Sequence, residues 1–174
     1  MPQKASHLSL VAHKSSKKLA ETVSGGTDSY VVAYLGKLRD RRTQTVRTES
    51  VLASETNGYG KNPVWSIESC RSINGRLDNV LYITPAANDV HLTLELWDSD
   101  LRSDDLLGGR TLQLAEIRRQ LSTMSGAATM HIQLFDQDGN EGFERGHDAG
   151  VLQIHASYER LTPDGERVID KTGG

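Results

Sequence analysis

The sequence predicts an all-β domain, an antiparallel sandwich or barrel of about eight strands. Apolar residues recur mainly with a period of two, which is typical of half-buried strands. Clusters of Gly, Asn, Asp and Pro separate these alternating stretches, as expected of turns between strands. The length of 174 residues suits one domain that is large enough to bury a core.

The strands are expected in chain order from short alternating or β-rich runs. Leu8, Leu10 and Ala12 alternate with polar neighbours, and "SYVVAYLG" is a run rich in β-branched and aromatic residues. The strictest alternation covers residues 90–97, where Val and Leu alternate with His, Thr, Glu and Trp. The eight expected strands lie at residues 8–12, 29–36, 44–52, 79–85, 90–97, 109–114, 130–134 and 152–158.

One segment, "QLAEIRRQL", has the spacing of a helix. Leu114, Ile117 and Leu121 fall on one face of it, so we expect a short amphipathic helix in a connection between strands. The domain is expected to span 6–161, with a flexible N-terminus at 1–5 and a C-terminal tail at 162–174.

Composition limits the partners, the cysteine chemistry and the cellular location that we expect. A formal net charge of -3 gives no bulk attraction to nucleic acid, so no nucleic-acid partner is expected. Cys70 is the only cysteine, which excludes an intramolecular disulfide and a zinc site built on several thiolates. No apolar run approaches the roughly 18 residues of a membrane span, and the first residues lack the pattern of a signal peptide. We therefore expect a cytoplasmic protein.

The stretch "WDSDLRSDDLLGG" concentrates negative charge directly after the most regular expected strand. It contains Asp98, Asp100, Asp104 and Asp105. Aspartates are common in solvated turns, where they bond to the local backbone. Alternatively, Asp98, Asp100 and one of the adjacent pair are oxygen ligands for a hard cation such as calcium. Asp28 precedes another expected strand, so antiparallel neighbours would bring it to the same rim.

Three motifs in this order resemble the C2-domain family: "GGTDSYVVAYLG", "KNPVW" and "LTLELWDSDLRSDDLLGG". The resemblance implies an eight-stranded antiparallel sandwich with Greek-key connections and calcium-binding loops at one end. Such domains generally dock proteins on anionic membranes. The second of the family's two circularly permuted topologies, type II, is the one expected here. The segment "SIESCRSINGRLDN", residues 66–79, is an insertion relative to the family's pattern.

The resemblance also implies a set of metal ligands. It assigns ligand roles to Asp28, Asp98, Asp100 and Asp105, and leaves Asp104 as an adjacent charge that is a possible further ligand. Thr22 stands where the family has its first aspartate, with Glu21 beside it, so both are possible ligands as well. Calcium is the only cofactor that we expect.

A basic stretch, "GKLRDRRTQTVR", follows the second expected strand. It carries Lys37, Arg39, Arg41, Arg42 and Arg47. Such a run is often a solvated face. It could instead bind anionic phospholipid headgroups, where each basic residue is worth on the order of 1 kcal/mol. The corresponding strand in the family often carries a polybasic lipid site.

These observations predict calcium-modulated binding to anionic phospholipid membranes, with the protein peripherally attached. The alternative is a calcium-independent protein-protein interaction module on the same scaffold, with an incomplete metal site because of Thr22. The sequence contains no nucleophile elbow and no phosphate-cradling glycine loop, so we do not expect an enzyme.

Overall fold

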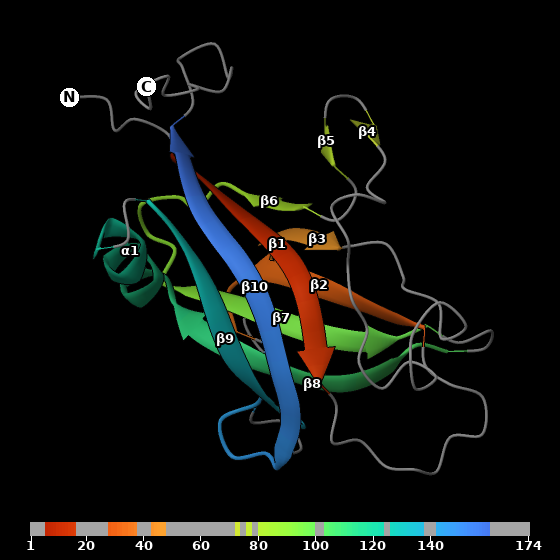
Figure 1. Cartoon of the computed structure of the whole chain (residues 1–174). Helices are drawn as coiled ribbons and strands as arrows, with labels where there is room; N and C mark the ends of the chain where they lie inside the picture. The colour runs from red at the N-terminus through yellow and green to blue at the C-terminus, as the bar shows by residue number, and fades with distance from the viewer. Residues whose placement is uncertain are drawn as a thin grey trace.

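The computed structural model describes most of the expected elements (Figure 1). The description covers residues 6–16, 28–37, 43–47, 72–73, 76–77, 80–99, 103–123, 126–137 and 142–160. The all-β class is confirmed, because strands predominate and α1 (Leu114–Thr123) is the one helix within these residues.

Each of the eight strands expected from the sequence is present, with somewhat different ends. They are β1 (Ser6–Ser16), β2 (Ser29–Leu35), β3 (Thr43–Arg47), β6 (Val80–Ile83), β7 (His91–Asp98), β8 (Asp105–Gln113), β9 (Ala127–Phe135) and β10 (Asp148–Arg160). The insertion supplies a separate hairpin of β4 (Ser72–Ile73) and β5 (Arg76–Leu77), which stands apart from the other strands in Figure 1.

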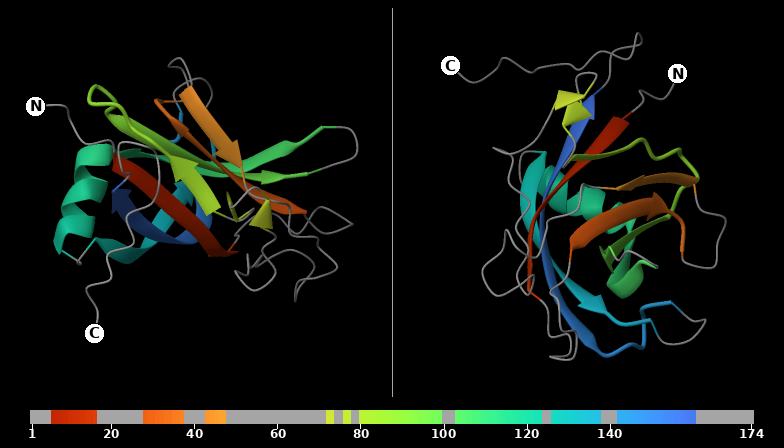
Figure 2. Two further views of the ribbon diagram at one scale, coloured as in Figure 1. Left: turned by 90° about the horizontal axis from the view of Figure 1, so that it is seen from above. Right: turned by 90° about the vertical axis from the view of Figure 1, so that its right-hand side faces the viewer.

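The eight long strands form one antiparallel sheet in the order β3-β2-β7-β8-β9-β10-β1-β6. The sheet curls so that its two halves face each other, with β3, β2, β7 and β8 on one side and β9, β10, β1 and β6 on the other (Figure 2). α1 connects β8 to β9 and packs at one end of this sandwich.

The core lies between the two halves and follows the period-two pattern. From one half come the inward residues of β2 and β7, including Val31 and Leu94, and from the other those of β9 and β10, including Ile132 and Ile154. The helix adds Leu114, Ile117 and Leu121, all buried as predicted from their spacing. Apolar side chains of this size each gain about 1.5–3 kcal/mol on full burial.

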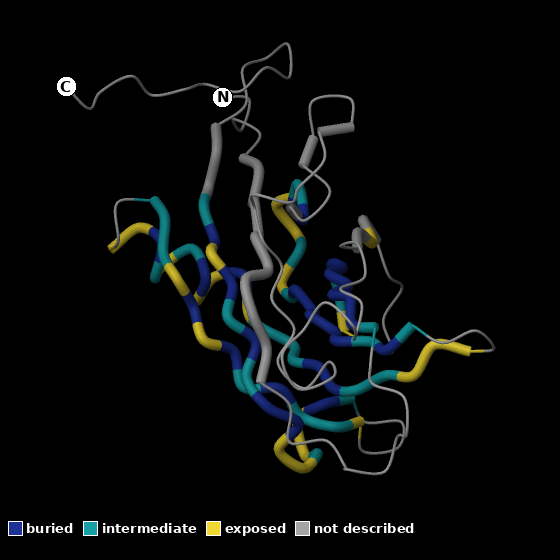
Figure 3. Tube along the Cα trace, turned by 45° about the vertical axis from the view of Figure 1, so that its right-hand side comes forward, coloured by how far each residue is buried: buried dark blue, intermediate teal, exposed yellow. Residues whose placement is uncertain are grey.

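Strands β2 and β7 differ from the expectation of half-buried strands, because their outward faces are buried too (Figure 3). On β7, Thr93 and Glu95 have no exposed surface. Part of the cover is Phe143, whose ring lies directly over Gly109, the residue paired with Glu95. A side chain from the connection between β9 and β10 thus reaches back over the sheet, which local alternation does not reveal.

Strand β8 begins earlier than expected, so the acidic loop is shorter than the sequence indicated. Asp105 already pairs with Asp98 at the end of β7, and the strand continues through Gly109. A register shift between Leu96 and Trp97 accommodates one extra residue on β8. Prediction from the sequence was wrong here because acidic and glycine residues disfavour strands locally, whereas pairing with β7 holds them in one.

The Phe143 ring leaves no room for a side chain at Gly109. A Cβ at this position would lie 2.4 Å from the Phe143 ring. We expect Gly109→Ala to lower the free energy of unfolding by about 1–3 kcal/mol, the usual cost of overpacking, as measured by urea denaturation. Gly126→Asn is the control: its φ of +88° suits Asn and nothing lies within 4 Å of a Cβ there, so its stability should stay close to wild type.

Candidate metal centre

Three of the aspartates predicted as ligands lie at one end of the sheet. Asp28 immediately precedes β2, whose first residue, Ser29, pairs with Asp98 at the end of β7. On the other side of β7, Asp98 pairs with Asp105 at the start of β8. Because β2, β7 and β8 are antiparallel neighbours, two acidic segments 70 residues apart meet at this rim.

Two hydrogen bonds join the segment before β2 to the end of β7. The backbone N–H of Asp28 donates to Oδ1 of Asp98 at 2.8 Å, and the N–H of Ser99 donates to the carbonyl of Asp28 at 2.8 Å. The Asp98 side chain is therefore held in a defined position, with the residue only 4% exposed. The hydrogen bond from Asp28 fixes the orientation of the Asp98 carboxylate at the rim.

The two adjacent aspartates, Asp104 and Asp105, have different surroundings. The hydroxyl of Tyr30 donates to Oδ2 of Asp104 at 2.6 Å, which ties this carboxylate to β2. Asp105 is exposed and lies across the ladder from Asp98. Tyr30 was not among the residues predicted for the site, although it belongs to the "DSYVV" motif and lies two residues after Asp28.

The oxygen donors fit calcium in kind, since calcium binds carboxylate and carbonyl oxygens and needs six to eight of them. Asp100, Glu21 and Thr22 lie outside the described residues. Within the described part of the chain, no three His, Cys, Asp or Glu residues are close enough to hold a metal ion together. A complete calcium shell therefore requires donors from positions beyond these, of which Asp100 is the nearest in sequence to Asp98 and Asp105.

A buried polar cluster that the sequence analysis missed supports the main chain next to Asp98. The carboxylate of Glu95 accepts hydrogen bonds from the Tyr34 hydroxyl at 2.8 Å and the Trp97 indole at 2.9 Å. Glu95 and Tyr34 are fully buried. The sequence did contain a sign of this cluster. In the alternating pattern, Tyr30 and Tyr34 fall on one face of β2, and Glu95 and Trp97 fall on the matching face of β7. Those pairs indicate an aromatic face beside the core.

The predicted lipid-binding residues are only partly within the description. Lys37 follows β2 and is exposed; its Nζ lies 3.8 Å from Oε1 of Glu144. Arg47 is in β3, where its backbone pairs with Val32. Arg39, Arg41 and Arg42 lie outside the described residues. Surface ion pairs such as the one made by Lys37 contribute only about 0–1 kcal/mol, so this contact would not compete strongly with a phosphate group.

Comparison with known proteins identifies the family of this chain. A model of the C2 domain matches residues 7–129, more than half of the chain. The chain belongs to the C2-domain family. This identification agrees with the motif resemblance and with the curled antiparallel sheet.

Solved structures share the fold of this C2 domain at low identity. One solved structure, described as "Structure of a C2 domain", is 21% identical to this chain with a TM-score of 0.51, and the match covers 88% of this chain and 97% of that one. The first C2 domain of plant extended synaptotagmin 1 is 12% identical with a TM-score of 0.57, covering 92% and 98%. A calcium-bound pair of C2 domains from extended synaptotagmin 2 is 16% identical with a TM-score of 0.56, covering 94% and 49%.

A search of curated proteins finds no match to this chain. Among the described residues, none of the helical structure has the length and apolar character needed to span a bilayer.

The Tyr30–Asp104 hydrogen bond predicts a local effect on the rim. Tyr30→Phe should speed amide hydrogen exchange at residues 103–105 with little change in global stability, because it releases one end of the loop. Tyr34→Phe is the matched control on the same face of β2: it deprives the buried Glu95 of a donor, so it should lower global stability by about 1–3 kcal/mol. Equal exchange at 103–105 in both variants would contradict a local role for Tyr30.

Proposed function

We propose that this C2 domain binds calcium at the rim formed by β2, β7 and β8 and thereby docks on anionic phospholipid membranes. The observation that carries the proposal is the register that brings Asp28, Asp98 and Asp105 to one end of the sheet. The candidate ligands are these three with Asp100, and Glu21, Thr22 or Asp104 could complete the shell. Because no three carboxylates of the described residues are close enough to hold an ion together, calcium would have to draw them closer on binding. The role is that of a peripheral binding module without catalytic activity.

The negative charge of the rim explains why calcium would change its affinity for a membrane. In the absence of a cation, several carboxylates at one end of the sheet repel an anionic leaflet. A bound divalent cation supplies positive charge that offsets them, so that the rim becomes attractive to phosphate headgroups. Asp98, held by the N–H of Asp28, gives this charge a defined location. The exposed Asp105 lies across the strand pair from it.

The basic stretch would add a second, calcium-independent attraction. Lys37, Arg39, Arg41, Arg42 and Arg47 lie within eleven positions of each other on and between β2 and β3. Their contribution would come from long-range attraction to lipid phosphates, which salt screens over a Debye length of about 8 Å at physiological ionic strength.

A calcium-independent protein-interaction module is the second candidate. It is favoured by Thr22 in place of a carboxylate and by the lack of a three-ligand group within the described residues. Liposome sedimentation separates the two functions. Vesicles containing phosphatidylserine should pellet the protein with calcium and release it with a chelator. Retention in the supernatant under both conditions would favour the interaction module.

Calcium should raise the melting temperature, because a ligand that binds only the folded state stabilises it by about 2.7 kcal/mol at one hundred times its Kd. Asp98→Asn combined with Asp100→Asn should abolish this shift in calorimetry. The apo protein should stay folded, since an asparagine Oδ1 can still accept the N–H of Asp28.

Asp89→Asn is the matched control for that experiment. The carboxylate of Asp89 also accepts a hydrogen bond from a backbone N–H, that of Ala86, at 2.6 Å. Asp89 precedes the first residue of β7, however, at the end of the strand opposite to Asp98. This variant should keep the full calcium shift. A full shift in the Asp98/Asp100 double variant would show that the metal site has been assigned to the wrong residues.

The lipid-binding role of the basic stretch can be tested with two adjacent arginine pairs. Arg41→Gln with Arg42→Gln should weaken binding to phosphatidylserine vesicles and reduce its salt dependence, while calcium affinity changes little. Arg118→Gln with Arg119→Gln removes the same charge from α1 and should leave vesicle binding closer to wild type. If both double variants bind vesicles equally, the basic stretch is only a solvated surface.

A further inference from the structure

The two halves of the sheet separate between β8 and β9. Although these strands are neighbours in the sheet, their register contains only the pair Gly109 and Phe135. Beyond that pair, β8 continues to Gln113 against β7, and β9 follows β10. α1 links the separated strand ends and buries one face in the core. The ladder is therefore open along part of this side of the sandwich.

A groove of about 440 Å³ lies where the strands separate. One wall consists of five consecutive residues of β9, Thr129–Gln133. Successive side chains of a strand point to opposite faces, so a wall made of consecutive residues is the backbone edge of the strand. The other walls include Arg110 and Leu112 of β8 and Glu116 and Gln120 of α1.

This edge of β9 is suited to pair with another strand. Thr129–Gln133 pair with β10 on one side, and on the groove side they have no ladder partner within the described part of the chain. Exposed edges are usually protected by Lys, Pro or a bulge, yet β9, "AATMHIQLF", contains neither Lys nor Pro. Its five groove residues span about 17 Å at 3.4 Å each, enough for an extended segment of similar length.

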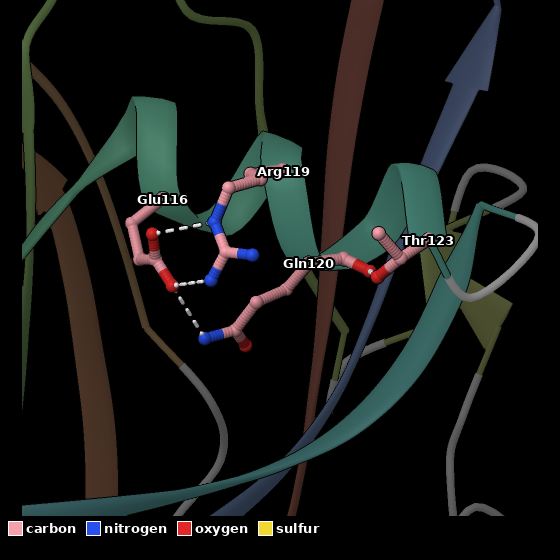
Figure 4. Close-up of polar contacts among 4 residues, drawn as sticks. All are labelled: Glu116, Arg119, Gln120 and Thr123. Atoms are coloured by element: carbon pink, nitrogen blue, oxygen red, sulfur yellow. Dashed lines mark hydrogen bonds and ion pairs between the residues drawn. The ribbon is translucent and has the colours of Figure 1, made fainter.

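The charges around the groove favour an acidic occupant. Among the described residues of its walls, Glu116 is the one carboxylate, and its charge is balanced by Arg119, which binds it through two nitrogens at 2.6 and 3.0 Å. Gln120 also donates to it at 3.0 Å (Figure 4). The hydrogen bond from Arg119 and then that from Gln120 lower the pKa of Glu116 to about 2. Glu116 therefore remains an anion paired with Arg119 at neutral pH.

Arg110 provides the uncompensated charge in the groove. Its guanidinium lies 5.0 Å from the centre of the Phe135 ring, and it forms no ion pair with any carboxylate of the described residues. The residue is partly buried, so an ion pair made there would be less screened than one on the open surface. A carboxylate on an added strand would supply the missing partner.

We propose that the groove-side edge of β9 binds an extended acidic segment of a partner protein by strand addition, with one of its carboxylates paired to Arg110. Main-chain hydrogen bonds would supply most of the affinity and the Arg110 pair the preference for acidic sequences. The groove adjoins Gln113, which pairs with His91 at the end of β7 opposite to Asp98. This binding is therefore separate from the calcium site and does not depend on it.

The test uses the full chain and a capped heptapeptide in which valine alternates with glutamate, followed by amide NMR shifts without calcium. The peptide should shift Thr129–Gln133 and Arg110 and slow exchange on β9. Methylating alternate peptide nitrogens, which removes ladder donors, should abolish binding, and the lysine counterpart of the peptide should bind at least tenfold more weakly than the glutamate peptide, because its charges repel Arg110. Arg110→Gln should weaken binding by about tenfold, the loss of one charge-assisted contact. Arg118→Gln should not.

Several results would overturn the proposal. They are an absence of shifts at millimolar peptide, equal binding of the methylated peptide, and shifts that map to the calcium rim. A response of the same β9 amides to phosphatidylserine vesicles in place of the peptide would identify the groove as a lipid site instead. Because no calcium is present, failure here leaves the proposed calcium function unaffected, and failure of calcium binding leaves this site unaffected.

Discussion

The antiparallel pairing of β2 with β7 is the constraint on which the rest of the structure depends. Its register runs from Ser29 opposite Asp98 to Leu35 opposite Leu92. A slip of one residue would turn the apolar side chains of one strand to the other face. The same slip would separate the N–H of Asp28 from the Asp98 carboxylate. The core and the acidic rim are thus two consequences of one register.

A second layer of packing fixes that register from the outward side. A buried carboxylate is costly unless it is hydrogen-bonded, and Glu95 has two donors, from Tyr34 and Trp97. Both come from the central pair of strands, so the cluster joins β2 to β7 across their outer face. Phe143 packs over Gly109 beside it. Trp97, the residue before Asp98, is thereby tied to this outward cluster.

The central strand β7 also separates the two proposed binding surfaces. Asp98 at its end belongs to the rim proposed to bind calcium, whereas His91 at its beginning pairs with the part of β8 that adjoins the groove. Eight residues of strand at about 3.4 Å each place them more than 20 Å apart. Charges at this distance in water are largely screened, so a membrane and a protein partner could be bound without direct competition.

The sequence by itself determined the all-β class, the eight strands, the helix and the core faces, because periods of 2 and 3.6 reflect burial directly. It also placed Asp28 and Asp98 at strand ends that antiparallel pairing would join. It could not predict that Asp105 lies within β8, or that Thr93 and Glu95 are buried, since these depend on β7 pairing and on Phe143 from a distant turn. Only the tertiary structure decided the bond from Tyr30 to Asp104 and the opening between β8 and β9. The bond joins segments 74 residues apart, and the opening depends on how β8 pairs with β7 and β9 with β10, neither of which a local pattern encodes.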